Sequence, residues 1–261
     1  MGSATSQARA GIDEALRAQP QAGLEDAREL FQASRAIERS PQVLASLADA
    51  VSGPDARAAL AQRVLGQLGA PAVSIVAHLA RQRWSEPADL LAAIDAAGIR
   101  VAVQSAGETD VAGEIASFQR IVASDADLEL ALGGLRGSAD DKARLVERLL
   151  AGKASPAAAV ILDHLVRAPR GRRIGQLLRS AATEVAAAAG RSLAVVTTAR
   201  AMPEAQLDRL RAGLERQYGR TLQLQQIVDP EVLGGLRVSI GDDIIDGTVR
   251  SKFTDLRLKL G

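Results

Sequence analysis

Cysteine is missing from this sequence of 261 residues, which also contains only two histidines and five aromatic residues. Without cysteine the chain has no disulfide, no thiolate nucleophile and no cysteine-based metal site. Two histidines are too few for a multi-histidine metal centre, and five rings are too few for a surface that stacks nucleic-acid bases. We therefore expect a chain that holds no metal and no cofactor.

An excess of charge of one sign is lacking as well, since 32 Lys and Arg residues face 31 Asp and Glu residues, a formal net charge of +1. A broad phosphate-binding face needs clustered positive charge, so we do not expect nucleic acid as a partner. The sequence contains no Gly-x-x-x-x-Gly-Lys-Ser/Thr loop, so we do not expect this chain to bind or hydrolyse ATP itself. The paired carboxylates at 140–141 and 242–243 are typical of helix caps and turns, and no nucleophile or base stands beside them. These absences indicate a protein that is not an enzyme.

Long apolar runs are also absent. Stretches such as residues 157–162 end after six residues, whereas a helix needs roughly 20 apolar residues to span a bilayer. The N-terminal residues MGSATSQAR are not followed by the apolar core of a signal peptide. We therefore expect no direct membrane insertion and a cytoplasmic chain, unless a partner holds it at a membrane.

Alanine and leucine are abundant, with 51 and 33 of the 261 residues, and this excess of good helix formers predicts a mainly helical protein. Within this background, residues 53–81 and 138–167 align with one inserted residue and are identical at 11 of 29 positions. The shared positions include the pairs Asp55/Asp140, Pro71/Pro156, His78/His164 and Arg81/Arg167. We interpret the repeat as a tandem duplication of a helical bundle, with a first copy over 1–105 and a second copy over 106–190.

Each copy has apolar residues at helical spacing between residues that begin and end helices. The first copy is predicted to form helices that begin near 6, 23, 41, 54, 71 and 87, and the sixth is expected to stop between Asp95 and Gly98. The second copy repeats the pattern with starts near 110, 125, 140, 156 and 172 and an end at 189–190. Short breaks between helices of this length are typical of bundles whose neighbours run antiparallel.

Two features of the copies suggest a site. His78 and His164 occupy equivalent places, which would suit a metal site or a proton relay, but neither has a second histidine or a cysteine nearby in sequence. We therefore favour a role for both in helix packing or at the surface. The arginine-rich segment 167–173 would suit phosphate binding, but we favour a solvated loop between helices or an interface to an acidic partner.

After Gly190 the hydrophobic period changes from that of helices to that of strands. Strands are predicted over 193–198, 221–225, 236–240 and 244–246, with an amphipathic helix over 203–218 and a final helix from 248. This indicates a small mixed β-sheet domain with two helices over 191–261. The expected fold class is therefore mainly α, with a tandem duplicated bundle followed by a C-terminal α+β domain.

Turn residues recur in this last domain. Gly234-Gly235 before a strand suits a bulge or a turn with positive φ, where a side chain would clash. Asp246-Gly247 suits a tight turn before a helix that Thr248 caps. We favour these structural roles over a direct role in ligand binding.

The order of residues in the last 35 positions is unusual. It contains Val228-Asp229, then LGGLRV over 233–238, Gly241-Asp242, IDGTVR over 245–250 and Leu256. This pattern resembles the C-terminal region of the δ subunit of F-type ATP synthase, whose mitochondrial relative is the oligomycin-sensitivity-conferring protein. That family places a helical bundle first and a small α+β domain last.

The duplication departs from the usual member of that family, which has one bundle. Some bacterial δ chains resemble this extended form, and among them are chains fused behind a membrane-anchored b-type stalk segment. The resemblance leaves open whether this chain is a separate subunit or a portion excised from such a fusion.

The resemblance implies a non-catalytic subunit of the peripheral stalk, or stator, present as a single copy in a hetero-oligomeric complex. Such a subunit links the catalytic α/β head to a b-type stalk subunit, so that rotor torque drives ATP synthesis rather than turning the head. The implied location is peripheral, on the cytoplasmic face of the bacterial plasma membrane, where the complex holds the chain.

The resemblance also implies two partner surfaces. In that family the first and fifth helices of the bundle bind the N-terminal helix of an α subunit, which points here to Ala8, Ile12, Leu16, Val73, Val76 and Ala77. The family's first helix usually carries an aromatic residue, which this one lacks. The tail resembles the part that joins the b-type stalk, which points to the apolar stripe Val249, Phe253, Leu256 and Leu260.

Two other classes of function remain open at this point. One is a helical adaptor or scaffold unrelated to ATP synthase, and the other is an RNA- or ribosome-associated protein that uses its arginines. A salt titration separates the latter, because phosphate binding weakens steeply with salt whereas docking of apolar helices does not.

Deleting residues 227–261 is expected to abolish binding to a b-type stalk subunit and to leave the helical part folded, because the motif that carries the resemblance lies in this segment. Binding is measured by copurification and folding by circular dichroism. Stalk binding that survives the deletion would contradict the assignment of the tail.

Overall fold

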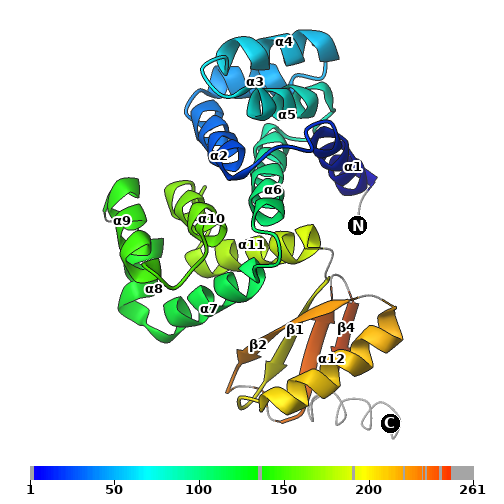
Figure 1. Ribbon diagram of the computed structural model, residues 1–261, viewed down its shortest axis with the longest axis vertical. Helices are drawn as coiled ribbons and strands as arrows, with labels where there is room; N and C mark the ends of the chain where they lie inside the picture. The colour runs from blue at the N-terminus through cyan, green and yellow to red at the C-terminus, as the bar shows by residue number, and fades with distance from the viewer. Residues whose placement is uncertain are drawn as a thin grey trace, which may run out of the picture. The chain divides into compact units, whose positions relative to one another are not determined.

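The computed structural model describes residues 3–134, 137–189, 192–219, 221–230, 232, 234–240 and 243–247 (Figure 1). The chain divides into two compact units, residues 1–185 and 186–261. The first unit and the start of the second are helical: α1 (Ser3–Arg17), α2 (Leu24–Glu38), α3 (Pro41–Ala48), α4 (Pro54–Val64), α5 (Ala70–Arg81), α6 (Pro87–Ser105), α7 (Val111–Ser124), α8 (Ala126–Gly133), α9 (Ala139–Leu150), α10 (Pro156–Arg167) and α11 (Ile174–Ala188). The rest of the second unit mixes strands with a helix: β1 (Ser192–Thr198), α12 (Glu204–Tyr218), β2 (Leu222–Val228), β3 (Leu236–Ile240) and β4 (Asp243–Asp246). The expected fold class, mainly α with a C-terminal α+β part, is confirmed.

Local sequence explains where many helices begin. Helices α3, α4, α6 and α10 each start at a proline, whose fixed φ suits the first turn and whose missing N–H has no partner there anyway. At α9, Ser138 accepts a hydrogen bond from the N–H of Asp141 at 3.1 Å, while Asp141 accepts one from the N–H of Ser138 at 3.0 Å. This reciprocal cap satisfies two N–H groups that the helix leaves without a partner.

The expected end of the sixth helix is wrong. Helix α6 runs on to Ser105 and contains Gly98 in its interior, because the residues after Gly98 continue its buried face and Ile99, Val101 and Ala102 are all buried. Gly98 serves packing instead: a Cβ on it would lie 2.6 Å from Cε1 of Phe31 on α2. A residue without a side chain is therefore needed where these two helices cross.

The two copies repeat the same ion pair. In the first copy, Arg81 on α5 binds Asp55 on α4, with 3.1 Å between Nη2 and Oδ1. At the equivalent positions of the second copy, Arg167 on α10 binds Asp140 on α9. Residues that are equivalent in sequence therefore make equivalent contacts.

A second contact also occurs in both copies. Glu29 on α2 accepts a hydrogen bond from the N–H of Gly69, just before α5, at 2.8 Å. Glu114 on α7 accepts one from the N–H of Ser155, just before α10, at 3.0 Å. The boundary between the copies at 105/106 stays a prediction, since the whole of 1–185 forms one compact unit.

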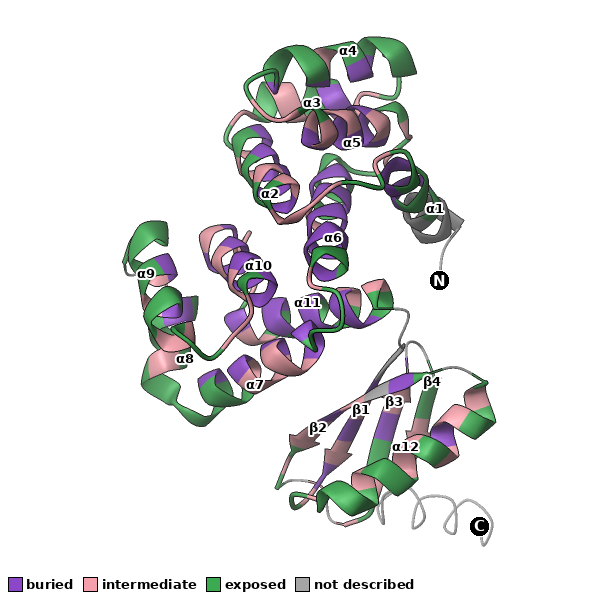
Figure 2. Ribbon diagram, viewed as in Figure 1, coloured by how far each residue is buried: buried purple, intermediate pink, exposed green. Residues whose placement is uncertain are grey.

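Helix α6 takes part in both copies. It packs on α1, α2, α3 and α5 of the first copy and on α10 of the second, and Figure 2 shows it buried along most of its length. Moving α1 forward by the 85-residue spacing of the repeat places it at 88–102, within α6. By repeat position, α6 therefore corresponds to α1 and α10 corresponds to α5, so α6 packs on α10 as α1 packs on α5.

The second unit is built on a four-stranded sheet in the order β2-β1-β3-β4. Strand β1 is parallel to β2 and antiparallel to β3, and β3 is antiparallel to β4, so the sheet is mixed. The connection from β1 to β2 is α12, which packs on β2. The core of the unit contains Ala194, Val196, Leu214, Leu222, Val238 and Ile240. The second helix predicted for this domain lies outside the described residues.

The glycines at the start and end of the β3–β4 hairpin have different tasks. Gly234 and Gly235 adopt φ values of 111° and 80°, which side chains rarely allow. Gly247 donates its N–H to Leu236 O at 2.9 Å, and a Cβ on Gly247 would lie 3.2 Å from that oxygen. The positive φ values are those expected of a turn at Gly234 and Gly235, whereas Gly247 continues the pairing of β3 with β4; the tight turn predicted before the final helix stays a prediction.

None of the described helices is both long enough and apolar enough to cross a membrane.

Replacing Gly98 with Ala is expected to lower the free energy of unfolding by about 1–3 kcal/mol, because the new Cβ overlaps a buried ring. The matched control is Gly175→Ala in α11, where a new Cβ meets only the end of the Arg179 side chain at 3.5 Å. Urea unfolding followed by Trp84 fluorescence and circular dichroism measures both. A Gly98→Ala chain as stable as the parent would show that the crossing of α2 and α6 is not tightly packed.

Candidate functional site

A largely buried carboxylate on α6, Asp95, whose side chain is 14 % exposed, joins three other segments of the helical unit. Ser34 on α2 donates its hydroxyl to Asp95 Oδ1 at 2.6 Å, and His164 Nε2 on α10 lies 2.9 Å from the same oxygen. Arg170, in the turn between α10 and α11, binds the other oxygen. The contacts span 61, 69 and 75 residues of sequence, so this cluster ties the two copies together.

The ring of His164 contacts two side chains of α2, one at its face and one at its edge. It stacks on Phe31 of α2, with the centroids 4.2 Å apart and 10° between the planes. Arg35 of α2 lies 3.2 Å from His164 Nδ1. Because arginine only donates hydrogen bonds, Nδ1 accepts, and the ring proton is on Nε2, where it donates to Asp95. His164 is therefore a packing histidine with every polar atom satisfied.

Arg170 reaches Asp95 through an unusual backbone conformation. Its φ is +46°, a region that residues other than glycine seldom adopt. Its Nε also lies 3.2 Å from Glu38 Oε1 on α2. Contacts to two carboxylates stabilise a turn that the local sequence by itself would not favour.

The charges of this cluster shift the pKa values of its members. Burial alone would raise the pKa of Asp95, but the hydrogen bond from His164 and the charge of Arg170 outweigh it and lower the pKa to about 2. For Arg170, burial would lower the pKa, but Asp95 and Glu38 raise it above its ordinary value. Both groups are thus charged at neutral pH, and each supplies the counter-charge that the other needs in a buried place.

A second buried charge lies five residues further along α6. The side chain of Arg100 binds Asp13 on α1, with 2.5 Å between Nη1 and Oδ1, and its Nη2 lies 3.7 Å from Glu184 on α11. Helix α6 therefore connects α1 at one side and α11 at the other. Ser34 is the one hydroxyl in these two clusters, and it donates to Asp95 while both nitrogens of His164 are engaged by Asp95 and Arg35, so no base activates it. The arrangement suits a rigid joint rather than catalysis. Within the described ranges, no three His, Cys, Asp or Glu side chains gather in a way that would hold a metal ion.

The residues predicted to bind a partner in the first copy lie where α1 meets α5. Ile12, Leu16, Val76 and Ala77 are buried, at 4, 8, 0 and 5 % exposure, and Val73 is half-buried. The backbone of Ala8 lies in α1, but its side chain is outside the described part of the chain. Most of these side chains thus hold α1 in the bundle, and their role toward a partner stays a prediction.

Polar contacts also join α1 and its following turn to α5, along the line where the two helices meet, which we call the seam of α1 and α5. Gln19 Nε2 donates to Ser74 Oγ of α5 at 3.1 Å. His78 Nε2 of α5 lies 3.6 Å from Glu14 Oε2 of α1, and the Glu14 side chain is 65 % exposed. This seam between α1 and α5 therefore presents the carboxylate of Glu14 to the solvent, with Val73, Ser74 and His78 partly exposed beside it.

The residues predicted to join the stalk lie outside the described part of the chain: Val249, Phe253, Leu256 and Leu260. Gly241 lies outside it too. Asp229, which follows β2, donates its N–H to Thr198 O at the end of β1, at 2.8 Å. Asp246 ends β4 and lies 3.9 Å from Arg237 on β3. These two acidic residues thus stabilise ends of strands.

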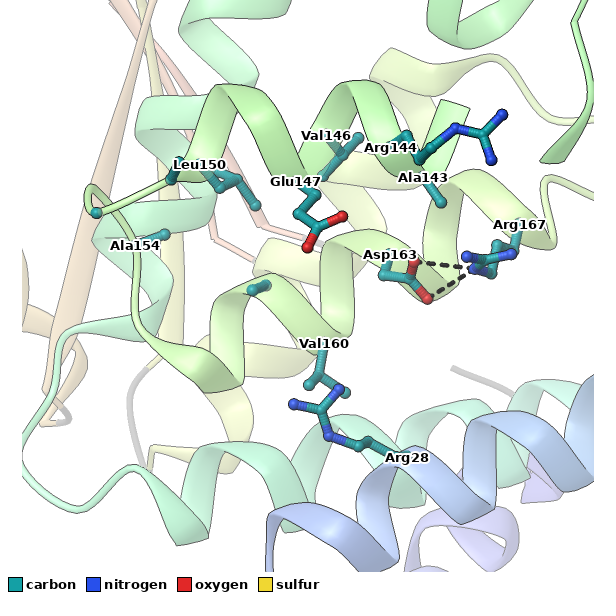
Figure 3. Close-up of a pocket in the computed structure, with 13 residues that line it drawn as sticks. Arg28, Ala143, Arg144, Val146, Glu147, Leu150, Ala154, Val160, Asp163 and Arg167 are labelled. Atoms are coloured by element: carbon teal, nitrogen blue, oxygen red, sulfur yellow. Dashed lines mark hydrogen bonds and ion pairs between the residues drawn. The ribbon is translucent and has the colours of Figure 1, made fainter. Parts of the chain in front are cut away.

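A pocket of about 540 Å³ opens beside α10, between α9 and the side chain of Arg28 from α2 (Figure 3). Val146, Leu150 and Val160 line its apolar part. Arg167 at its rim donates from Nε to both oxygens of Asp163, at 2.9 Å each. Because this guanidinium is already neutralised, it has little charge left to attract an anion, and we assign no ligand to the pocket.

The structure changes the reading of the arginine-rich segment. Arg167 and Arg170 bind carboxylates of the chain itself, so they are not free for phosphate. Asp95 and Arg100 were missed by sequence reasoning, although both are isolated charges in the apolar run 90–103 (LLAAIDAAGIRVAV). An isolated charge in such a run indicates a buried ion pair, but its partner cannot be read from sequence.

Comparison with known proteins gives a family, relatives of known name and one solved structure. The family described as "ATP synthase delta (OSCP) subunit" matches residues 96–260. A protein named ATP synthase subunit delta from Leifsonia xyli is 46 % identical over 262 residues, covering 100 % of this chain and 99 % of the relative. One of the same name from Nocardioides is 36 % identical over 238 residues, covering 90 % of this chain and 86 % of the relative. Among solved structures, a chain of the Toxoplasma gondii mitochondrial ATP synthase hexamer matches with TM-score 0.38 and 16 % identity, covering 62 % of this chain and 94 % of that one.

Changing Asp95 to Asn is expected to lower the free energy of unfolding at pH 7 by about 2–4 kcal/mol, because it removes one of the two carboxylates that neutralise Arg170 and leaves only Glu38. The low pKa of Asp95 stabilises the fold above the pKa of the unfolded chain, near 4, and this stabilisation is lost as the pH falls toward 2. The difference between parent and variant should therefore shrink between pH 5 and pH 2, as measured by urea unfolding at each pH. The control is Asp140→Asn, an exposed ion pair whose loss should have little effect. A difference that is constant over this range would show that Asp95 is not charged in the fold.

Proposed function

Because the chain belongs to the ATP synthase delta (OSCP) subunit family, we propose that it ties the catalytic α/β head to a b-type stalk subunit, so that rotor torque drives ATP synthesis. Members of this family are non-catalytic components of the peripheral stalk and work within the ATP synthase complex. Family membership also decides between the functions left open by the sequence, and neither an unrelated adaptor nor an RNA-associated protein is retained.

The observation that best supports the proposal is the clustering of buried charges on α6. A subunit that resists torque must bind at both ends without bending between them. Asp95 and Arg100 connect α6 to α1, α2, α10 and α11 through direct polar contacts. Preformed helices also need little ordering on binding, which preserves affinity.

For the head, the proposed contact is the seam between α1 and α5, where the N-terminal helix of an α subunit would lie. Four buried residues hold α1 and α5 together beneath this surface: Ile12, Leu16, Val76 and Ala77. Val73, Ser74 and His78 are partly exposed above them. An amphipathic helix that lies along the seam of α1 and α5 would bury its apolar stripe against this surface. Ala8, near the N-terminus, is proposed to belong to this head contact as well.

For the stalk, the proposed contact is the apolar stripe Val249, Phe253, Leu256 and Leu260. The proposed location is peripheral, on the cytoplasmic face of the bacterial plasma membrane. We propose one copy per complex, because one chain suffices to connect one head to one stalk.

The test measures binding of the full chain separately to the isolated α/β head and to the cytoplasmic portion of a b-type subunit. The parent chain is expected to bind both. Ser74→Arg, which places a long charged side chain in the seam of α1 and α5, should weaken binding to the head at least about tenfold and leave binding to the stalk unchanged. Phe253→Asp should do the reverse, so each variant is the control for the other. A parent chain that binds neither partner at mild salt would refute the proposal.

A further inference from the structure

The two copies differ in what covers the equivalent seam. In the first copy, the pair Glu14 and His78 between α1 and α5 is open, with side chains 65 and 22 % exposed. In the second copy, the pair Asp95 and His164 between α6 and α10 is closed, with side chains 14 and 2 % exposed. Since α6 and α10 correspond to α1 and α5, the same seam is accessible in one copy and buried in the other.

Helix α2 closes the seam of the second copy. It packs on both α6 and α10. Three side chains on one face of α2 reach this seam. Phe31 stacks on His164, and Arg35 donates to the same ring. Ser34 donates to Asp95. Phe31 and Ser34 are almost fully buried, at 1 and 0 % exposure. An amphipathic helix thus already lies along α6 and α10, with its apolar and polar groups matched to them.

We infer that α2 is a built-in occupant of the seam between α6 and α10, and that, of these two equivalent seams in the described part of the chain, that of α1 and α5 alone is open to a helix of a partner. This inference rests on the proposed binding of a head helix along α1 and α5. It adds that the second copy does not bind another such helix, although its sequence repeats the first.

The fit of α2 leaves no room for a competitor. Gly98 allows the Phe31 ring to approach so closely that even a methyl group would overlap it. A helix from another chain would have to displace that ring and also replace the hydrogen bonds of Ser34 and Arg35. Leaving Asp95 and His164 buried without these partners would be costly.

The seam of the first copy has no equivalent occupant. The residues that correspond to Asp95 and Gly98 are Ala10 and Asp13, and Asp13 is bound by Arg100 from the side of α6. Among the described residues, none packs over Glu14 as α2 packs over Asp95. The exposed carboxylate of Glu14 favours a partner helix that carries a basic residue at the edge of its apolar stripe.

The experiment uses the full chain and a synthetic peptide of the N-terminal segment of the α subunit encoded with it. Isothermal titration calorimetry is expected to give one peptide per chain. Hydrogen exchange should show added protection in α1 and α5 and none in α6 or α10. Ser74→Arg should weaken binding at least about tenfold, whereas Ala159→Arg, at a half-buried position of α10, should leave it unchanged; circular dichroism checks that both variants fold.

The outcomes separate this inference from the proposed function. Two peptides per chain, or protection that appears in α6 and α10, would overturn the inference while the binding of a head helix stands. Loss of binding in Ala159→Arg but not in Ser74→Arg would overturn it in the same way. A parent chain that does not bind the peptide would overturn both.

Discussion

The helical unit depends on one buried carboxylate, Asp95, and on the groups that neutralise it. A charge in the interior is costly unless it is paired and hydrogen-bonded, and Asp95 meets this condition only when α2, α10 and the turn after α10 are all in place. Apolar side chains of suitable size can often repack, whereas a charge in the interior tolerates only an arrangement that brings its partners to it. The polar cluster therefore selects one arrangement of the two copies.

The position of this cluster explains the importance of α6. Helix α6 belongs to the first copy by sequence and also serves as the first helix of the second copy. The two copies are therefore joined by a shared packed helix and not by a flexible linker. Arg100 extends the same connection to α1 and α11. For a stalk subunit this is a physical advantage, because a shared helix with buried ion pairs transmits force without a flexible joint.

The polar residues of the helical unit serve structure rather than chemistry. His164, Arg167 and Arg170 are the residue types from which active sites are built, yet each is bound to a carboxylate of the chain itself. The equivalent residues of the two copies also show how duplication diverges. The ion pairs Asp55–Arg81 and Asp140–Arg167 are preserved, while His78 remains near the surface and His164 becomes part of the interior.

By itself, the sequence determined the helical class, the internal repeat, the strands of the last domain and the family, because these depend on composition, local periodicity and a contiguous motif. It did not reveal that Gly98 lies inside a helix, since the reason is the ring of Phe31, 67 positions earlier in the chain. Nor did it distinguish His78 from His164, whose local sequences are alike. Only the tertiary structure decided which of the two is buried, because burial depends on α2, which the fold brings to α10 from the other copy.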